Sequence, residues 1–191
     1  MKRVISIVAL AAVCVFAAAS TAGATGMALR GIGGHLTIVS PEDVDATLGF
    51  GILADFGTVG TTRIGVESFM GYWSQSEEAF GTEVSLSDLI IGGRGKYMFE
   101  VSNPVVHPYA GAGLAFHFVS MGVEIAPVDF GGYIIPGQSI EDNEFKIGLD
   151  LGGGLTVDVS EKVSLLGDSW ISMVSDVSQF AVRFGMIYRL Q

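Results

Sequence analysis

Charged side chains recur singly along segments that otherwise consist of apolar residues, glycine and alanine. If these charges point into an enclosed space, they can line an ion path or gate it, or they can form a salt-bridge network that fills it. We expect the network, because an unpaired charge in a confined interior is costly. Arg63 would pair with Glu67, and the aspartates with arginines. The set comprises Arg63, Glu67, Arg94, Lys96, Lys146, Asp150, Asp168 and Arg183.

Three histidines, His35, His107 and His117, lie near serines and raise the question of a hydrolase. Nucleophilic catalysis requires a serine within hydrogen-bonding reach of a histidine that a carboxylate orients. His117 and Ser120 are three residues apart, so an extended strand places them on opposite faces. The sequence therefore predicts no catalytic residue and a protein that is not an enzyme. An enzyme that modifies lipid A is the less favoured alternative.

Two acidic clusters, 42–45 and 141–144, carry the carboxylate oxygens that Ca²⁺ and Mg²⁺ prefer. Neither cluster has the spacing of an EF-hand loop, and solvated charge is the favoured interpretation. Gly31-x-Gly33 resembles the start of a dinucleotide fingerprint, but Leu36 stands where the third glycine would be. We therefore predict no metal site and no cofactor.

The elements that position these residues are strands, because hydrophobicity alternates with a period of two along most of the chain. Each run is long enough to cross a bilayer at a tilt, which takes about 9–11 residues. An even number of strands lets the two ends of the sheet pair in antiparallel fashion, and closure leaves no unpaired backbone in lipid. The eight runs are approximately 28–39, 46–56, 62–73, 84–99, 107–118, 145–157, 163–171 and 179–191.

The composition agrees with strands that cross a membrane. Hydrophobic residues make up 49% of the 191 residues and the mean hydropathy is +0.52, which is high for a soluble domain. Lys2 and Arg3 precede an apolar run that ends at small residues, so residues 1–24 are predicted to be a signal peptide and residues 25–191 the barrel. Cys14 lies inside that signal, which leaves no thiol in the mature chain. The remaining charge is strongly acidic, which excludes nucleic acid as a partner.

The residues opposite the apolar parity decide between a membrane barrel and a soluble, lipocalin-like one. They are mainly glycine, alanine and serine, with a few charges of both signs. A face exposed to water would carry more lysine, glutamate and threonine, whereas small residues among paired charges suit a narrow, filled lumen. We therefore predict that the apolar parity faces lipid.

Two motifs carry a resemblance to a known family. The closing strand has Arg183, Gly185, Tyr188 and Leu190 at positions that resemble the assembly signal of outer-membrane β-barrels. The run from Pro108 to Gly113, Pro-Tyr-x-Gly-x-Gly, is similar to the central strand of small OmpA/OmpX-like barrels. The resemblance implies an all-β, eight-stranded antiparallel up-and-down transmembrane β-barrel in the outer membrane of a Gram-negative bacterium. It also implies assembly by the β-barrel assembly machinery and contact with outer-membrane lipid and lipopolysaccharide.

The connections between strands divide into long and short ones. Loops predicted at 40–45, 74–83, 120–143 and 172–178 would lie outside the cell, and short turns near 57–61, 100–105 and 158–162 inside, as in outer-membrane barrels. The outer loops carry no lysine or arginine. We predict a structural or surface-interaction role in which acidic loops meet an external partner, with a narrow small-solute channel as the alternative. The outer acids are Glu42, Asp43, Asp45, Glu77, Glu78, Glu83, Glu124, Asp129, Glu141, Asp142, Glu144 and Asp176.

Overall fold

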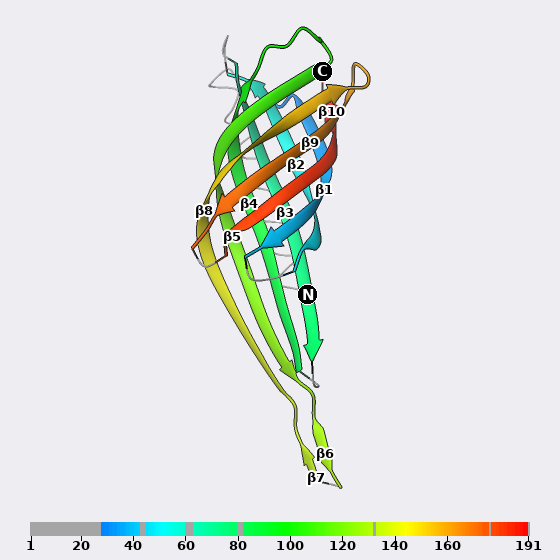
Figure 1. Ribbon diagram of the computed structural model, residues 1–191, viewed down its shortest axis with the longest axis vertical. Coiled ribbons are helices and arrows are strands. Elements are labelled where there is room, and N and C mark those ends of the chain that lie inside the picture. The colour runs from blue at the N-terminus through cyan, green and yellow to red at the C-terminus, as the bar shows by residue number, and fades with distance from the viewer. Residues whose placement is uncertain are drawn as a thin grey trace.

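The structure is a computed structural model that describes residues 28–42, 45–59, 63–79, 82–131, 133–175 and 177–190. In these residues eight antiparallel strands close into a barrel, and two short strands form a separate hairpin (Figure 1). The predicted fold class is confirmed. The barrel strands are β1 (Gly31–Pro41), β2 (Thr47–Thr58), β3 (Ile64–Ala79), β4 (Thr82–Met98), β5 (Val106–Ile125), β8 (Gln138–Asp158), β9 (Val163–Met173) and β10 (Gln179–Arg189).

The barrel closes where the first strand pairs with the last. β1 and β10 are in register from Gly31 opposite Arg189 to Pro41 opposite Gln179. A side chain at Gly185 would place its Cβ 2.8 Å from the Cβ of His35, so the closing strand needs a glycine at this point. Every barrel strand thus has two neighbours, as a sheet in lipid requires.

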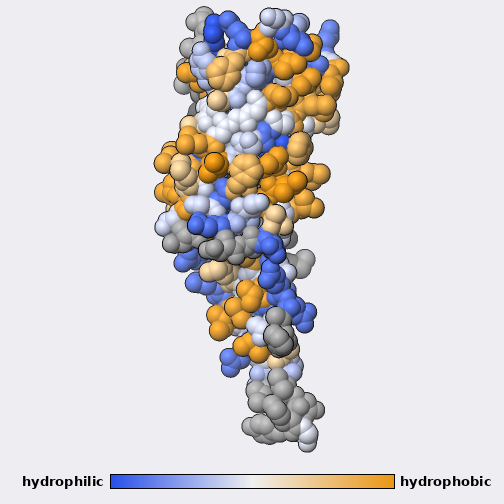
Figure 2. Space-filling model, viewed as in Figure 1, coloured by the Kyte–Doolittle hydropathy of each residue, from blue (hydrophilic) through white to orange (hydrophobic). Residues whose placement is uncertain are grey.

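Apolar side chains on the barrel strands point outward and polar ones point inward. Leu48, on the outer side of β2, is 74% exposed, whereas Glu67, on the inner side of β3, is 1% exposed. Figure 2 shows hydrophobic residues spread over the surface of the barrel. This distribution is the reverse of a lipocalin, whose apolar residues line the interior. Among the described residues no helix is long and apolar enough to cross a membrane.

Four strands continue well beyond one end of the barrel (Figure 1). They are residues 74–79 of β3, 82–87 of β4, 120–125 of β5 and 138–143 of β8, which pair in six rows from Ser74, Ser87, Ser120 and Asn143 outward. We call this region the protruding sheet. Its tip is the hairpin of β6 (Val128–Phe130) and β7 (Tyr133–Ile135).

The predictions of loops at 74–83 and 120–143 are therefore wrong for most of those residues, which form strands. The alternation does continue there, but the apolar residues change parity. Val84 and Leu86 lie on the side of β4 that carries Asp88, and Met121 and Val123 follow the parity of His117 on β5. A prediction that follows one apolar parity ends the runs 62–73 and 107–118 at this change and begins the run 145–157 there, whereas the run 84–99 already extends past it.

The other end of the barrel has short turns. Gly57 adopts a φ of 66°, which favours glycine, and its N–H donates to Asp55 Oδ1 at 2.9 Å. At the turn between β8 and β9 the N–H of Val159 donates to the carbonyl of Val163 at 3.0 Å. Gly31 and Arg189 also lie at this end. Short turns mark the periplasmic side of outer-membrane barrels, so we expect the protruding sheet to lie on the opposite, outer side.

Candidate functional site: the charged lumen

Inward-facing charges from five strands meet inside the barrel. Six of the eight residues predicted to form a lumen network are buried there and contact one another through carboxylate and cationic groups. The strands bring them together because residues of the same parity on a closed sheet all point toward the axis. These six are Glu67, Arg94, Lys96, Asp150, Asp168 and Arg183.

Glu67 of β3 contacts three cations. Arg183 Nη2, on β10, donates to Glu67 Oε1 at 3.1 Å, and Lys96 Nζ donates to Oε2. Arg94 Nη1 lies 3.8 Å from Oε1. Since β2 and β1 separate β3 from β10 around the barrel, the bond between Glu67 and Arg183 crosses the lumen.

Asp168 of β9 binds the same arginine and shares its Nη2 with Glu67. Arg183 Nε donates to Asp168 Oδ1 at 2.8 Å, and Arg183 Nη2 donates to Oδ2 at 2.6 Å. The hydroxyl of Tyr109, on β5, donates to Oδ2 at 2.5 Å. Such paired, charge-assisted bonds fix the guanidinium in orientation as well as position.

Asp150 of β8 binds the second arginine. Arg94 Nε and Nη2, on β4, donate to Asp150 Oδ2 at 2.8 and 2.6 Å. Ser172, on β9, donates from Oγ to Oδ1 at 2.6 Å. Since β5 lies between β4 and β8, this pair also bridges strands that are not neighbours.

Aromatic rings pack against the cations. The guanidinium carbon of Arg94 lies 3.8 Å from the ring centroid of Phe69 and 4.0 Å from that of Trp170. Such contacts are favourable because the ring face carries partial negative charge. Two glycines make room for the indole: a Cβ at Gly152 would lie 2.7 Å from it, and one at Gly111 would lie 3.1 Å from it. The inward glycines of the sequence thus accommodate large side chains of nearby strands.

A second layer lies toward the protruding sheet, and sequence analysis did not assign it. His117 Nδ1 and Asp88 Oδ2 are 2.7 Å apart, and both side chains are fully buried. Trp73 Nε1 donates to Gln179 Oε1 at 3.0 Å across the lumen. The signal that could have found these residues is their inward parity, which they share with the charges that were assigned.

Two predicted members lie apart from this network. Arg63 does not reach Glu67: it precedes β3, is half exposed, and its Nη2 lies 2.6 Å from Glu100 Oε1. The predicted pairing of Arg63 with Glu67 is therefore wrong. Arg63 has the same parity as Glu67, but it lies before the start of the strand and is no longer inside the barrel. Lys146 faces inward nearer the protruding sheet, and its Nζ lies 2.9 Å from Glu144 Oε2.

The histidines and serines do not form a nucleophilic pair where the structure brings them together. At the short-turn end Asp158 accepts bonds from Ser164 Oγ at 3.0 Å and pairs with His107 Nε2 at 3.0 Å and with Arg189. Serine and histidine both bind the carboxylate rather than each other, so the histidine does not activate the hydroxyl. The cluster ties β5, β8, β9 and β10 together at the rim.

The acidic clusters show no metal-binding arrangement in the described part of the chain, where no group of three or more potential ligands gathers. Asp43 lies outside the described residues. Glu141 and Asp142 are adjacent on β8 and so point to opposite faces of the sheet.

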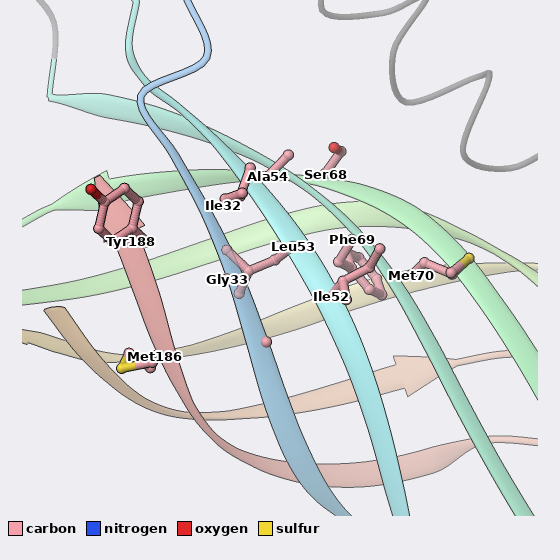
Figure 3. A pocket seen from close by; sticks show the side chains of 11 residues that line it. Ile32, Gly33, Ile52, Leu53, Ala54, Ser68, Phe69, Met70, Met186 and Tyr188 are labelled. Carbon is pink, nitrogen blue, oxygen red and sulfur yellow. The ribbon is translucent and has the colours of Figure 1, made fainter. Parts of the chain in front are cut away.

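A hollow of about 440 Å³ lies on the outer wall of the barrel, between β10, β1, β2 and β3 (Figure 3). Its walls come from outward-facing Ile32, Ile52, Met70 and Met186, and its floor includes small residues such as Ala54. The hollow therefore lies on the lipid-facing side of the barrel.

The residues of the predicted assembly signal occupy different environments. Arg183 belongs to the lumen network, and Gly185 packs against His35. Tyr188 is exposed on the outer side of β10. Leu190 follows that strand, and its N–H donates to the carbonyl of Arg30 at 2.7 Å.

Comparisons with known proteins agree with this geometry. The family model described as outer membrane protein beta-barrel domain matches residues 6–189. Neisserial surface protein A is 16% identical, with a TM-score of 0.57 over 84% of this chain and 96% of that one. A major outer membrane protein from Thermus thermophilus is 14% identical, with a TM-score of 0.57 over 84% and 99%. Ail, the attachment invasion locus protein of Yersinia pestis, is 17% identical, with a TM-score of 0.51 over 85% and 97%. No curated protein matches the sequence.

Proposed function

The chain belongs to the outer membrane protein beta-barrel domain family, and we propose that it is a non-enzymatic surface protein. It lies in the bacterial outer membrane. We propose that its barrel is closed to solutes and serves as a rigid base, and that the protruding sheet presents an acidic surface to a partner outside the cell. Lipopolysaccharide and outer-membrane lipid would surround the barrel, and the β-barrel assembly machinery would insert it.

The observation that carries the proposal is the network across the lumen. Glu67, Asp150 and Asp168 balance Arg94, Lys96 and Arg183, and all six are buried. An ion path would have to pass side chains that are bonded to partners on opposite walls and packed against Phe69 and Trp170. An eight-stranded barrel is just wide enough for side chains to fill it. The arrangement therefore favours a plug over a pore.

The acidic sheet supports the second part of the proposal. No lysine or arginine lies within its four segments, which carry six acids. Basic residues outside the lumen network, such as Arg30, Arg63, Lys162 and Arg189, gather at or near the opposite end. A surface of one sign raises the association rate of partners of the other sign. The six acids are Glu77, Glu78, Glu83, Glu124, Glu141 and Asp142.

Conductance measurements in planar bilayers test the closed barrel. We expect the refolded protein to give no single-channel steps, under conditions in which a general porin, refolded in the same way, conducts. Conductance steps that change in the Arg94→Ala variant would instead support the narrow channel. Loss of the steps on heat denaturation would show that they come from the folded barrel rather than from a contaminant.

A further inference from the structure

The inner face of the protruding sheet is apolar and lies open. Residues whose parity points into the lumen within the barrel continue as aliphatic side chains beyond it. Val84 is 50% exposed, Met121 48%, Ile125 41% and Ile140 62%. These side chains face the space beyond the rim of the barrel rather than lipid, because the outward parity of the same strands carries the lipid-facing residues of the barrel.

The facing strands are too short to cover this surface in the part of the chain that the structure describes. β1 ends at Pro41, where the N–H of Glu42 donates to the carbonyl of Ser178 at 2.8 Å. β9 ends at Met173. Strands β1, β2, β9 and β10 therefore end near the rim, while β4 and β5 continue past it (Figure 1).

The apolar residues form a stripe along the two central strands, and Ile140 of β8, opposite Val123, extends it by one residue. Leu86 of β4 lies opposite Met121 of β5, and Val84 lies opposite Val123. Neighbouring strands are about 4.8 Å apart, so a stripe over two strands is about 10 Å wide. In Figure 2 hydrophobic residues lie in the middle of the narrow part below the barrel, with hydrophilic residues on both sides.

Acidic side chains border the stripe on both sides. Glu77 of β3 lies opposite Val84, and Asp142 of β8 lies opposite Met121, so both point to the inner face. Asp45, between β1 and β2, joins Glu77 around a hollow of about 630 Å³ that is also lined by Val84, Leu86 and Met121. In the described residues the ion pair nearest this surface joins Lys146 to Glu144, and none involves Glu77 or Asp142.

We propose that this face is the docking site of a cationic amphipathic α-helix in a polypeptide partner. An α-helix with its side chains is about 10–12 Å across, which matches the stripe. Its apolar side would pack on Val84, Leu86 and Met121, and lysine or arginine beside that apolar side would pair with Glu77 and Asp142. The inference rests on the proposed function, since it names the partner of the acidic sheet.

The charges select this occupant over two others. A second copy of the chain would bring its own acids against Glu77 and Asp142, because its protruding sheet carries no cation. A free acyl chain would fill the stripe but leave the acids on both borders without a counter-charge. A polypeptide with apolar and basic side chains satisfies the stripe and its borders together, whereas these two occupants do not.

The test uses the full mature protein in zwitterionic lipid nanodiscs and a fluorescent synthetic peptide that forms an amphipathic helix of leucine and lysine. Binding is followed by fluorescence anisotropy, with empty nanodiscs subtracted. A second peptide keeps every lysine but has serine in place of leucine. We expect the leucine peptide to bind at least about tenfold more tightly than the serine peptide.

Acid variants locate the charges. The double change Glu77→Gln with Asp142→Asn should weaken binding of the leucine peptide by about three- to tenfold, since exposed ion pairs contribute modestly. The matched control is Glu78→Gln with Glu141→Gln. These acids are the sequence neighbours of the first pair and make the same change in net charge, but they point to the outer face. The control should leave binding unchanged at physiological salt.

Apolar variants locate the stripe. Val84→Thr with Val123→Thr preserves branched side chains suited to a strand but adds a hydroxyl to each, and should weaken binding about tenfold. The control is Ser87→Thr with Ser120→Thr, a cross-strand pair on the outer face. It should have no effect.

Several results would overturn the inference. Equal binding of the two peptides, or equal losses from the inner and outer acid pairs, would mean that general acidity attracts the peptide. Unchanged binding after the valine substitutions would mean that the stripe is not the contact, and light scattering that shows two barrels joined through these valines would make a second copy the occupant.

Failure of this inference can be told apart from failure of the closed barrel. If the protein gives no conductance in bilayers and binds no peptide, the docking site is wrong and the closed barrel stands. A conducting protein that binds the peptide would lose the closed barrel instead.

Discussion

The protruding sheet continues strands of the barrel, but its apolar residues lie on the opposite face. In the barrel they lie on the outer face, and in the protruding sheet they lie on the inner face. On β5 the outward residues Phe116 and Phe118 are followed by outward Ser120 and Glu124. On the inward side His117 is followed by the buried Val119 and then by the exposed Met121. The strand continues without interruption while the polarity of its two faces is exchanged.

The exchange shows where lipid ends. Tyr72, Leu89, Phe118 and Phe145 form the last outward row of large apolar residues across β3, β4, β5 and β8. The ring centroids of Phe118 and Phe145 lie 5.3 Å apart. Aromatic side chains favour the interface between lipid and water. Beyond this row the outer face is in a polar environment. Outward apolar residues are no longer favoured there, because no lipid contacts them.

The lumen and the inner face of the protruding sheet also differ in whether their side chains have partners. In the lumen, buried charges are paired, and removing one partner leaves the others uncompensated. On the inner face of the protruding sheet, apolar side chains stay in contact with solvent. The first region is therefore expected to determine stability, and the second to be free for binding.

Removing the central carboxylate should have the largest effect. Glu67→Ala leaves Arg183 and Lys96 without a shared partner, and breaking a buried ion pair costs about 3–5 kcal/mol. The free energy of unfolding in lipid vesicles, measured with urea, should fall by that amount. Glu78→Ala, on the protruding sheet, should change it by less than about 0.5 kcal/mol. Similar values for the two variants would remove the distinction between the regions.

A single lysine tests the exchange of faces. Leu114→Lys places a charge on the lipid-facing side of β5 and should destabilise the barrel by about 2–4 kcal/mol if the position lies near the middle of the bilayer. Ser120→Lys has the same outward parity on the same strand and should cost almost nothing. The measurement is again unfolding in vesicles. A comparable loss from Ser120→Lys would mean that lipid extends over the protruding sheet.

Much of the barrel could be predicted from the sequence, because each strand in lipid must alternate. Arg94 and Asp150 could be placed in one lumen by parity alone, since a narrow closed sheet brings inward residues together whatever their separation in the chain. The pairing of Arg63 could not be predicted, because parity does not show where a strand leaves the barrel.

The protruding sheet could not be predicted for a related reason. Serine and glutamate at Ser76 and Glu124 indicated loops, since polar residues had replaced the expected apolar parity. The aliphatic residues Val84 and Val123 kept the period of two on the other parity. Neither the polar residues nor the aliphatic residues indicate which face of the chain meets solvent. The continuation of the strands therefore follows only from the strand pairing in the structure.

The outer face of the protruding sheet should respond least, and its response should depend on salt. Glu78, Glu83 and Glu124 lie directly opposite one another on β3, β4 and β5, so three like charges form one row. Opposed like charges destabilise a strand pair by about 0.2–1 kcal/mol. Glu83→Gln removes the middle charge and should slow hydrogen exchange of the neighbouring amides at low salt, with a smaller gain at high salt because ions screen the repulsion. Ser85→Ala, on the same face of the same strand, is the control. An equal gain at both salt concentrations would show that the effect is not electrostatic, and would assign the looser pairing of this row to the open edges of the sheet.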